Sequence, residues 1–330
     1  MMDKEFRKNR YRQFSTQEAI PVFSQPWWLD AVCGENNWDV ILYEKGGQIV
    51  ASFPYYLKTA KVKELCIPRL TQKMGPYIKY PPKQQRLEKR LAYEREVMDY
   101  IIESLPDYDI FRVNFDYTVT NWLPFYWKGF EQSTRYTYIV PDLSDTVQVF
   151  ESFASGKKTD IKKASKSVAV KYDLGGGNFI DYYIDCLASQ GKTLAYSRDF
   201  FLRLYDAAIE NQQGRIIYAV DKDNPNKIFG AIFYIWDKTA IYSLVTAFHP
   251  LYRSTGAPSL LFWQIMKDFK DSGLKFDFEG SMIEECEKSY NKFGCLQIPY
   301  FCISHHRTKK AKIFELLKVV KNEIISISSK

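Results

Sequence analysis

The chain has 330 residues but few of the residue types that build metal or redox centres. It contains three histidines, and its six cysteines include no C-x-x-C pair. Protein metal sites rely mainly on closely spaced Cys and His, so we predict no metal site. Unpaired cysteines scattered along a chain also favour a reducing compartment, and we therefore expect a cytoplasmic protein.

Long apolar runs are missing as well. No stretch approaches the roughly 18 apolar residues that a membrane-spanning helix needs, and residues 1–14 are charged where a signal peptide would be apolar. We therefore expect a protein that is neither secreted nor membrane-spanning.

Familiar catalytic signatures are also absent. We find no Ser-His-Asp or Cys-His arrangement, which argues against a side-chain nucleophile. Three consecutive glycines, residues 175–177, lack the neighbours found in phosphate-binding or dinucleotide-binding loops. We interpret them as a flexible break.

Apolar and aromatic residues are abundant, at 46% and 16% of the chain. This composition is typical of folded proteins, and the length suits two domains with separate cores. The net charge of +7 suits a phosphate-bearing ligand or an anionic surface. The sequence lacks the clustered basic and aromatic residues of a general nucleic-acid binder, so we predict no DNA partner.

Three short segments of the first half recur in the second half, in the same order and at offsets of 164 to 176 residues. The pairs are residues 23–32 and 196–208, 40–57 and 216–236, and 126–130 and 290–294. They read as an aromatic helix, as two strands joined by a polar turn, and as a turn before a strand. Three matches in one order indicate two copies of one fold, and two copies imply a site shared between them.

Hydrophobic periodicity predicts further elements around these segments. In the first half we predict a helix over 83–104 and strands over 109–115 and 134–140. In the second half we predict a helix over 200–212, strands over 215–221, 228–236, 240–247 and 274–281, and a helix from Pro258 to Gly273. This succession indicates an α/β fold.

A lysine-rich stretch, residues 155–174, marks the expected change from one copy to the other. We predict an N-terminal domain over 1–149, a C-terminal domain over 150–307 and an amphipathic basic helix over 308–330. Such a helix either docks on its own domain, which we expect, or lies on an anionic membrane. Its apolar stripe comprises Ile313, Leu316, Leu317, Val320 and Ile324.

The segment Arg253, Ser254, Thr255, Gly256 and Ala257 lies between a predicted strand and a predicted helix. Glycine and small neighbours let a ligand approach the backbone, and the free amides of a helix start attract a phosphate or an oxyanion. Arg253 adds a planar set of donors. We predict a ligand-binding loop here.

Arg253, Gly256 and Ala257 in this position resemble motif A of the GNAT acyltransferases, which holds the phosphates of acyl-coenzyme A. The chain has Pro258 where that motif prefers Gly or Ala. Four further segments resemble the Fem-type peptidoglycan aminoacyltransferases and their FemAB-like relatives. These segments are FSQPWWLDAV (23–32), SGKKTDIKKASKSVAVK (155–171), FDFEGS (276–281) and YNKFG (290–294).

The resemblance implies an α/β (α+β) fold of tandem GNAT-like domains, each a mixed, mostly antiparallel sheet flanked by helices, with a shared cleft. It implies transfer of an acyl or aminoacyl group to an amine, with a cell-envelope or peptidoglycan precursor as the expected acceptor. Acyl-CoA or aminoacyl-tRNA would be the cosubstrate, and we expect no tightly bound cofactor. The coiled-coil arm of many Fem-type enzymes has no counterpart between Asn178 and Arg307.

Transfer from an activated ester or thioester needs mainly positioning and stabilisation of the oxyanion. Asp277 and Glu279 alternate along the predicted strand, so both carboxylates are expected on one face. If that face lines the cleft, one of them acts as a base or binds the amine, and if it faces solvent, both are ordinary surface carboxylates. Tyr290 is a further catalytic candidate.

Lys162 and Lys163 are candidates for binding phosphates of a small-molecule acceptor, a lipid-linked acceptor or tRNA. A solvated lysine face is the alternative. Lys292, with Tyr290, either contacts substrate at the domain junction or belongs to a structural turn used in both copies. Membrane contact through the tail helix would place the protein at the inner face of the membrane. Two other functions stay open: an acyl-CoA-dependent N-acetyltransferase acting on a small molecule or sugar amine, and a GNAT-fold binding protein without catalysis. We expect the second copy to hold the donor and the chemistry, and the first to contact the acceptor.

Overall fold

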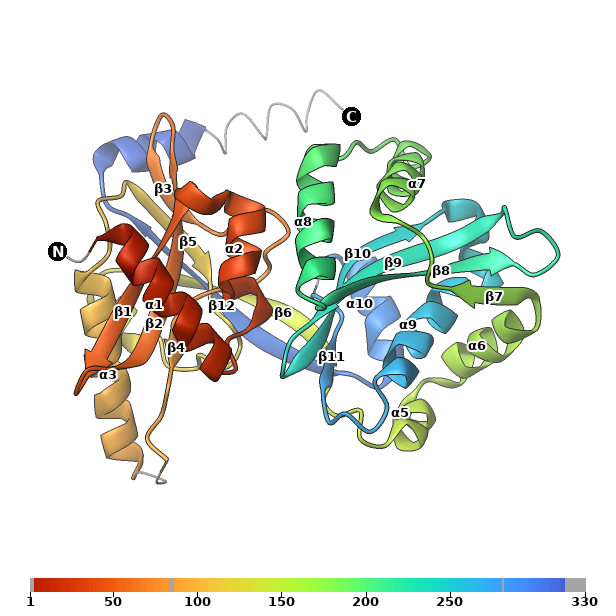
Figure 1. Cartoon of the computed structure of the whole chain (residues 1–330), viewed down its shortest axis with the longest axis horizontal. Helices are drawn as coiled ribbons and strands as arrows, with labels where there is room; N and C mark the ends of the chain where they lie inside the picture. Colours follow the sequence, from red (N-terminus) through yellow and green to blue (C-terminus); the bar gives the residue numbers. More distant parts are fainter. Residues whose placement is uncertain (1–2, 83–85, 281, 318–330) are drawn as a thin grey trace. The chain divides into compact units, whose positions relative to one another are not determined.

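The computed structural model describes residues 3–82, 86–280 and 282–317. The chain divides into two compact units. Unit 1 comprises Met1–Glu18, Cys33–Thr134 and Tyr300–Lys330, and unit 2 comprises Ala19–Val32 and Arg135–Pro299. Figure 1 shows the elements of both units. Among the described residues, no helix is long and apolar enough to cross a membrane.

Unit 1 is built on a sheet with the strand order β1-β2-β3-β5-β12, in which only β3 and β5 run parallel. Helices α1 and α3 pack against β1. The strands are β1 (Trp38–Lys45), β2 (Gln48–Thr59), β3 (Lys63–Cys66), β4 (Tyr77–Ile78, paired with β2), β5 (Ile110–Asn114) and β12 (Leu296–His306). The helices are α1 (Lys4–Gln17), η2 (Glu35–Asn37), α3 (Leu87–Glu103) and α4 (Leu123–Trp127).

Unit 2 has the strand order β6-β11-β10-β9-β8-β7, in which only β10 and β11 run parallel. Its strands are β6 (Glu131–Val140), β7 (Val168–Lys171), β8 (Gly214–Asp221), β9 (Ile228–Trp236), β10 (Ala240–Phe248) and β11 (Lys275–Asp277). Its helices are η1 (Val22–Ser24), α2 (Pro26–Cys33), α5 (Thr146–Ser152), α6 (Ser155–Ser167), α7 (Gly176–Ala188), α8 (Arg198–Glu210), η3 (Pro250–Thr255), α9 (Ala257–Asp268), α10 (Glu284–Tyr290) and η4 (Asn291–Phe293).

Helices cover both faces of the unit 2 sheet, with α7 and α8 on one side and α6 and α9 on the other in Figure 1. Successive residues of β9 point to opposite faces. Phe233 contacts Phe179 of α7 and Phe201 of α8, whereas Ile232 belongs to the core cluster that includes α9. Helix α6 packs against α9 in turn. The buried side chains of both faces make unit 2 a three-layer structure.

The two halves of the chain repeat one succession of elements, which confirms the duplication. The correspondence, in chain order, is α1 with α7, α2 with α8, β1 to β3 with β8 to β10, α3 with α9, β5 with β11, α4 with α10 and β6 with β12. In each half, one long helix connects the two parallel strands: α3 connects β3 to β5, and α9 connects β10 to β11. The last strand of each half adds to the sheet formed by the other half of the chain: β6 pairs with β11, and β12 pairs with β5.

Three sequence-based expectations differ from the structure. The predicted domain boundary at residue 149 falls inside α5, whereas the units divide at residues 134 and 299 because the last strands are exchanged. The glycines at 175–177 are not a break, since α7 begins at Gly176, which packs on the ring of Tyr205. The strand predicted over 274–281 ends at Asp277. The sequence patterns also do not predict α1 or α5.

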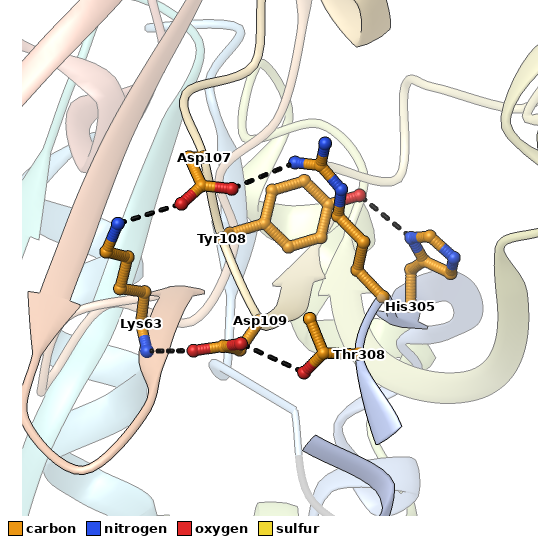
Figure 2. A network of polar contacts seen from close by, with 7 residues as sticks. Lys63, Asp107, Tyr108, Asp109, His305 and Thr308 are labelled. Atoms are coloured by element: carbon orange, nitrogen blue, oxygen red, sulfur yellow. Dashed lines mark hydrogen bonds and ion pairs between the residues drawn. The ribbon is translucent and has the colours of Figure 1, made fainter. Parts of the chain in front are cut away.

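The polar network of Figure 2 attaches the end of β12 to unit 1. The Lys63 ammonium lies 2.8 Å from Asp107, and Arg307 lies 3.3 Å from the same carboxylate. Asp109 accepts hydrogen bonds from the backbone amide of Lys63 and from the Thr308 hydroxyl, both at 2.9 Å. These contacts fix the point at which the C-terminal helix begins.

Residues 309–317 form the described part of that helix. Ala311 and Phe314 pack against Val62 and Ile110, so the described part of the helix contacts unit 1 through these two residues. The docked stripe is not the predicted one, because Ile313, Leu316 and Leu317 are exposed. Val320 and Ile324 lie outside the described residues.

Candidate active site

The parallel strands β10 and β11 of unit 2 separate partway along β10. Their pairing runs from Ala240 with Lys275 to Tyr242 with Asp277. Strand β10 then continues to Phe248 beside β9, whereas β11 has ended. Among the described residues, the β11 side of β10 therefore lacks a strand partner beyond Tyr242, and its backbone groups there are available to a ligand.

A β-bulge lies at the point of separation. The register between β10 and β9 shifts between Tyr242 and Val245, so Ser243 and Leu244 stand outside the regular ladder. The Ser243 side chain is only 4% exposed, and its hydroxyl has no hydrogen-bond partner within the described part of the chain. A buried hydroxyl without a partner is costly unless a ligand satisfies it. The bulge therefore marks a candidate binding position.

The start of α9 follows β10 through η3, as the sequence predicts. Gly256 adopts φ +76°, and a Cβ there would lie 2.5 Å from the carbonyl oxygen of Asp160 in α6. Two backbone positions of the first turn offer no free amide: the Ala257 amide donates to Thr255 Oγ1, and Pro258 has no N–H. The helix start therefore has fewer donors for a phosphate than a usual helix N-terminus.

The side chains of Arg253 and Ser254 are exposed on η3, next to this helix start. The Arg253 guanidinium lies 3.5 Å from the Gln190 side-chain oxygen, which is a long and weak contact. It is therefore available to an anionic ligand.

Lys157 of α6 lies beside α9 and was not among the residues that sequence patterns indicate. Its ammonium group donates to Ser259 Oγ at 3.2 Å and to Ser289 Oγ at 3.3 Å, and it lies 4.7 Å from the ring centre of Phe293. Burial lowers its pKa, and the positive charge of Lys292 adds to that effect. The negative charge of Asp160 opposes this lowering, so Lys157 has both a positive and a negative side chain nearby.

The predicted catalytic carboxylates have different environments. Asp277 is fully buried and accepts hydrogen bonds from the Thr137 hydroxyl and from the backbone amide of Glu279. Glu279 lies beyond the end of β11 with φ +67° and is partly exposed. The two residues therefore do not alternate along one strand. Asp277 holds the turn, and Glu279 is the more exposed of the two, although its Oε1 atom is buried.

Tyr290, at the end of α10, packs on Phe278, the residue before Glu279. Its ring stacks on Phe278 at 4.7 Å between centres. Burial raises the pKa of the phenol, and the negative charge of Glu279 contributes to the rise. Tyr290 is therefore a neutral hydrogen-bond donor at neutral pH and not a base.

The three lysines predicted to bind substrate do not form one cluster. Lys162 and Lys163 are exposed on α6, while Lys292 is exposed on η4. The η4 turn is fixed because Gly294 has φ +64° and approaches Ser152 of α5 too closely for any side chain. Among the described residues, no group of three or more His, Cys, Asp or Glu side chains could hold a metal.

Sequence reasoning also missed Ser243 and Thr137. Both stand in apolar strands, where a lone hydroxyl is a weak signal. Only the register of β10 against β9 and β11 shows that Ser243 occupies a bulge.

Comparison with known proteins bears on this site. The model of an acetyltransferase (GNAT) domain family matches residues 169–284, which contain β10, α9 and β11. Comparison with curated protein sequences gives no match.

Several solved structures share the fold over most of the chain. A crystal structure of FemX has a TM-score of 0.63 and 11% identity, covering 91% of this chain and 96% of that one. The C-terminal domain of a protein assigned as a lysylphosphatidylglycerol synthetase from Agrobacterium fabrum gives 0.52 and 12%, covering 96% and 97%. A tandem GNAT protein from the clavulanic acid biosynthesis pathway gives 0.50 and 10%, covering 92% and 95%. At these identities the likeness shows the fold.

Proposed function

We propose that this chain, which has the tandem GNAT fold of the Fem-type acyltransferases, transfers an acyl or aminoacyl group to an amine. The observation that carries the proposal is the separation of β10 and β11 at the bulge of Ser243 and Leu244. Backbone amides exposed there can bind the oxygen on which negative charge develops during acyl transfer. This position lies within the residues that match an acetyltransferase domain.

Glu279 is the proposed base or amine-binding group. It stands two residues after the end of β11, and Asp277 orients its backbone through the hydrogen bond of 2.8 Å. The attacking amine must lose a proton, and a partly exposed carboxylate at the strand end can accept it. Tyr290, as a neutral phenol, can donate a hydrogen bond to the leaving group. Asp277 is a positioning residue in this proposal.

The donor in this proposal is an activated ester or thioester. The scarcity of free amides at the start of α9 disfavours a donor held there by a pyrophosphate, which supports aminoacyl-tRNA over acyl-CoA. Arg253, Lys162 and Lys163 supply positive charge for either donor. Both donors occur in the cytoplasm, so the proposal keeps the cytoplasmic location expected from the sequence. Neither donor is a tightly bound cofactor.

The acceptor in this proposal is an amine-bearing cell-envelope precursor, either a phosphate-bearing small molecule or a lipid-linked one. The name of the lysylphosphatidylglycerol synthetase describes an aminoacylated lipid, and the Fem-type resemblance points to a peptidoglycan precursor. Lys157 and Lys292 are the proposed contacts to acceptor phosphates. Contact with a membrane surface is argued below from the C-terminal helix.

The test is transfer of a labelled group to a panel of amines by the full chain, with aminoacyl-tRNA and acyl-CoA as alternative donors. We expect Glu279→Gln to lower kcat/KM by about 100-fold, in the range typical of general acid–base catalysis. Glu285→Gln is the matched control, because Glu285 is an exposed carboxylate on α10. Binding of tRNA that falls steeply with salt would support the first donor, and thermal stabilisation by coenzyme A would support the second.

A second candidate is a GNAT-fold binding protein without turnover. It is favoured by Pro258 and the covered start of α9. In that case the chain would bind a donor or an acceptor, no product would form with any donor, and Glu279→Gln would leave every cellular phenotype unchanged.

A further inference from the structure

The C-terminal helix of unit 1 presents an apolar stripe to solvent. Ile313, Leu316 and Leu317 are 60%, 64% and 62% exposed. They follow one another at i, i+3 and i+4, so they lie on one face of the helix. Large aliphatic side chains gathered on one exposed helix face mark an interaction surface.

The opposite face of the same helix is fixed to unit 1. Ala311 is buried against Val62 and Ile110, with Phe314 packed beside it. Glu315 accepts a hydrogen bond from Arg112 at 2.8 Å. The helix start is held by the network of Figure 2, in which Thr308 donates to Asp109. Because one face is docked in this way, the apolar stripe points away from unit 1.

Within residues 309–317, the charged side chains that border the stripe are lysines. Lys309, Lys310 and Lys312 are exposed and flank the apolar residues. The single acid of residues 309–317 is Glu315, which is paired with Arg112 on the docked face. An apolar stripe bordered by lysines matches an anionic lipid surface, in which acyl chains meet negatively charged headgroups.

We propose that this helix binds the surface of a membrane containing anionic lipids, with Ile313, Leu316 and Leu317 inserted among the lipids. A second copy of the chain suits the surface less, because its lysines would face those of the first copy. The proposal goes beyond the acyltransferase function and does not depend on it, since it concerns a surface of unit 1.

The test is co-sedimentation of the full chain with vesicles of phosphatidylcholine, with and without phosphatidylglycerol. We expect binding to the mixed vesicles, loss of that binding at high salt, and weak binding to phosphatidylcholine alone. The double variant Leu316→Glu/Leu317→Glu should bind the mixed vesicles at least about tenfold more weakly, because it removes most of the apolar stripe. Leu87→Glu is the matched control, since Leu87 is 70% exposed on α3.

Charge variants provide a second measurement that cannot disturb the docked face. Lys309→Glu/Lys310→Glu should also weaken binding to the mixed vesicles by about 30-fold, because the two lysines together contribute about 2 kcal/mol, roughly 1 kcal/mol each. Equal sedimentation of the wild type and both double variants would overturn the proposal. So would a wild-type dimer that Leu316→Glu/Leu317→Glu converts to a monomer, because the stripe would then be an interface between copies. Transfer activity on a water-soluble amine is measured in parallel and should be unchanged in all of these variants.

Discussion

Gly256 provides a direct test of the packing that surrounds the candidate active site. It precedes α9 with φ +76°, and the carbonyl oxygen of Asp160 lies where a side chain would begin. In Gly256→Ala, the left-handed conformation costs about 1–2 kcal/mol. The new Cβ would lie 2.5 Å from a backbone oxygen, so α6 must move as well, which adds about 1–3 kcal/mol. We therefore expect the variant to lose about 2–5 kcal/mol of stability.

Gly129 is the matched control for this measurement. It also has a positive φ, of +85°, but no heavy atom lies within 4 Å of the position that a Cβ would take. Gly129→Ala should therefore lose only the conformational part, about 1–2 kcal/mol. Urea denaturation followed by tryptophan fluorescence measures both losses, with attention to whether the two units unfold in separate transitions. Equal losses for the two variants would refute the close packing of α6 against the start of α9.

Three further predictions concern single side chains. Thr137→Val should lower the free energy of unfolding by about 1–3 kcal/mol, because the buried Asp277 carboxylate loses a hydrogen-bond donor. In the same urea assay, Thr134→Val at an exposed position of the same strand should change it by less than about 0.5 kcal/mol. Lys157→Met should keep the Tm within about 2 °C while weakening the binding of a phosphate-bearing substrate, measured by calorimetry. Lys166→Met, at an exposed position of the same helix, is the control, and unchanged affinity in Lys157→Met would exclude Lys157 from the site. Burial lowers the pKa of His305 from its ordinary value, so the unfolded chain takes up a proton first as the pH falls. Stability should therefore decrease as the pH falls through the ordinary histidine range, and His305→Phe should flatten that slope in pH-dependent denaturation. An unchanged slope would contradict this assignment.

Local patterns predict most of the elements of this fold. The two strand pairs, β1 with β2 and β8 with β9, follow alternating apolar residues around polar turns, and their spacing indicates the duplication. The helix α9 follows from its apolar spacing and its proline near the start. The resemblance to Fem-type acyltransferases is confirmed at the level of the fold.

Tertiary pairing explains what the sequence does not predict. The sequence does not predict that β6 pairs with β11 and β12 with β5. Both β6 and β12 have similar local sequence patterns, so the pattern does not indicate which strand each one pairs with. The prediction of a flexible break at residues 175–177 is wrong at Gly176, although consecutive glycines usually interrupt helices and strands. Here the absence of a side chain lets the start of α7 approach the Tyr205 ring. Ser243 is a candidate because of the register between β10 and β9, and Lys157 because it lies close to Ser289. Hydrophobic periodicity in the sequence predicts neither.

The duplication raises the question of why only one copy should carry the chemistry, and the parallel strand pairs give a physical answer. In unit 1, the chain that leaves β3 returns beside β5, where Met74 pairs with Phe115. The amide of Met74 donates to Asn114 at 2.8 Å, and its carbonyl accepts from Asp116 at 2.8 Å. Gly75 then packs on the Phe115 ring.

The backbone next to β5 in unit 1 is therefore occupied by the chain itself. In unit 2, residues 249–256 lead directly from β10 into α9, and among the described residues no such segment returns beside β11. An oxyanion needs amides that are free before the substrate arrives, because displacing an intramolecular strand contact would offset the binding energy. If the chain is an acyltransferase, its transfer site belongs to unit 2, and the matching position of unit 1 is closed to the same reaction.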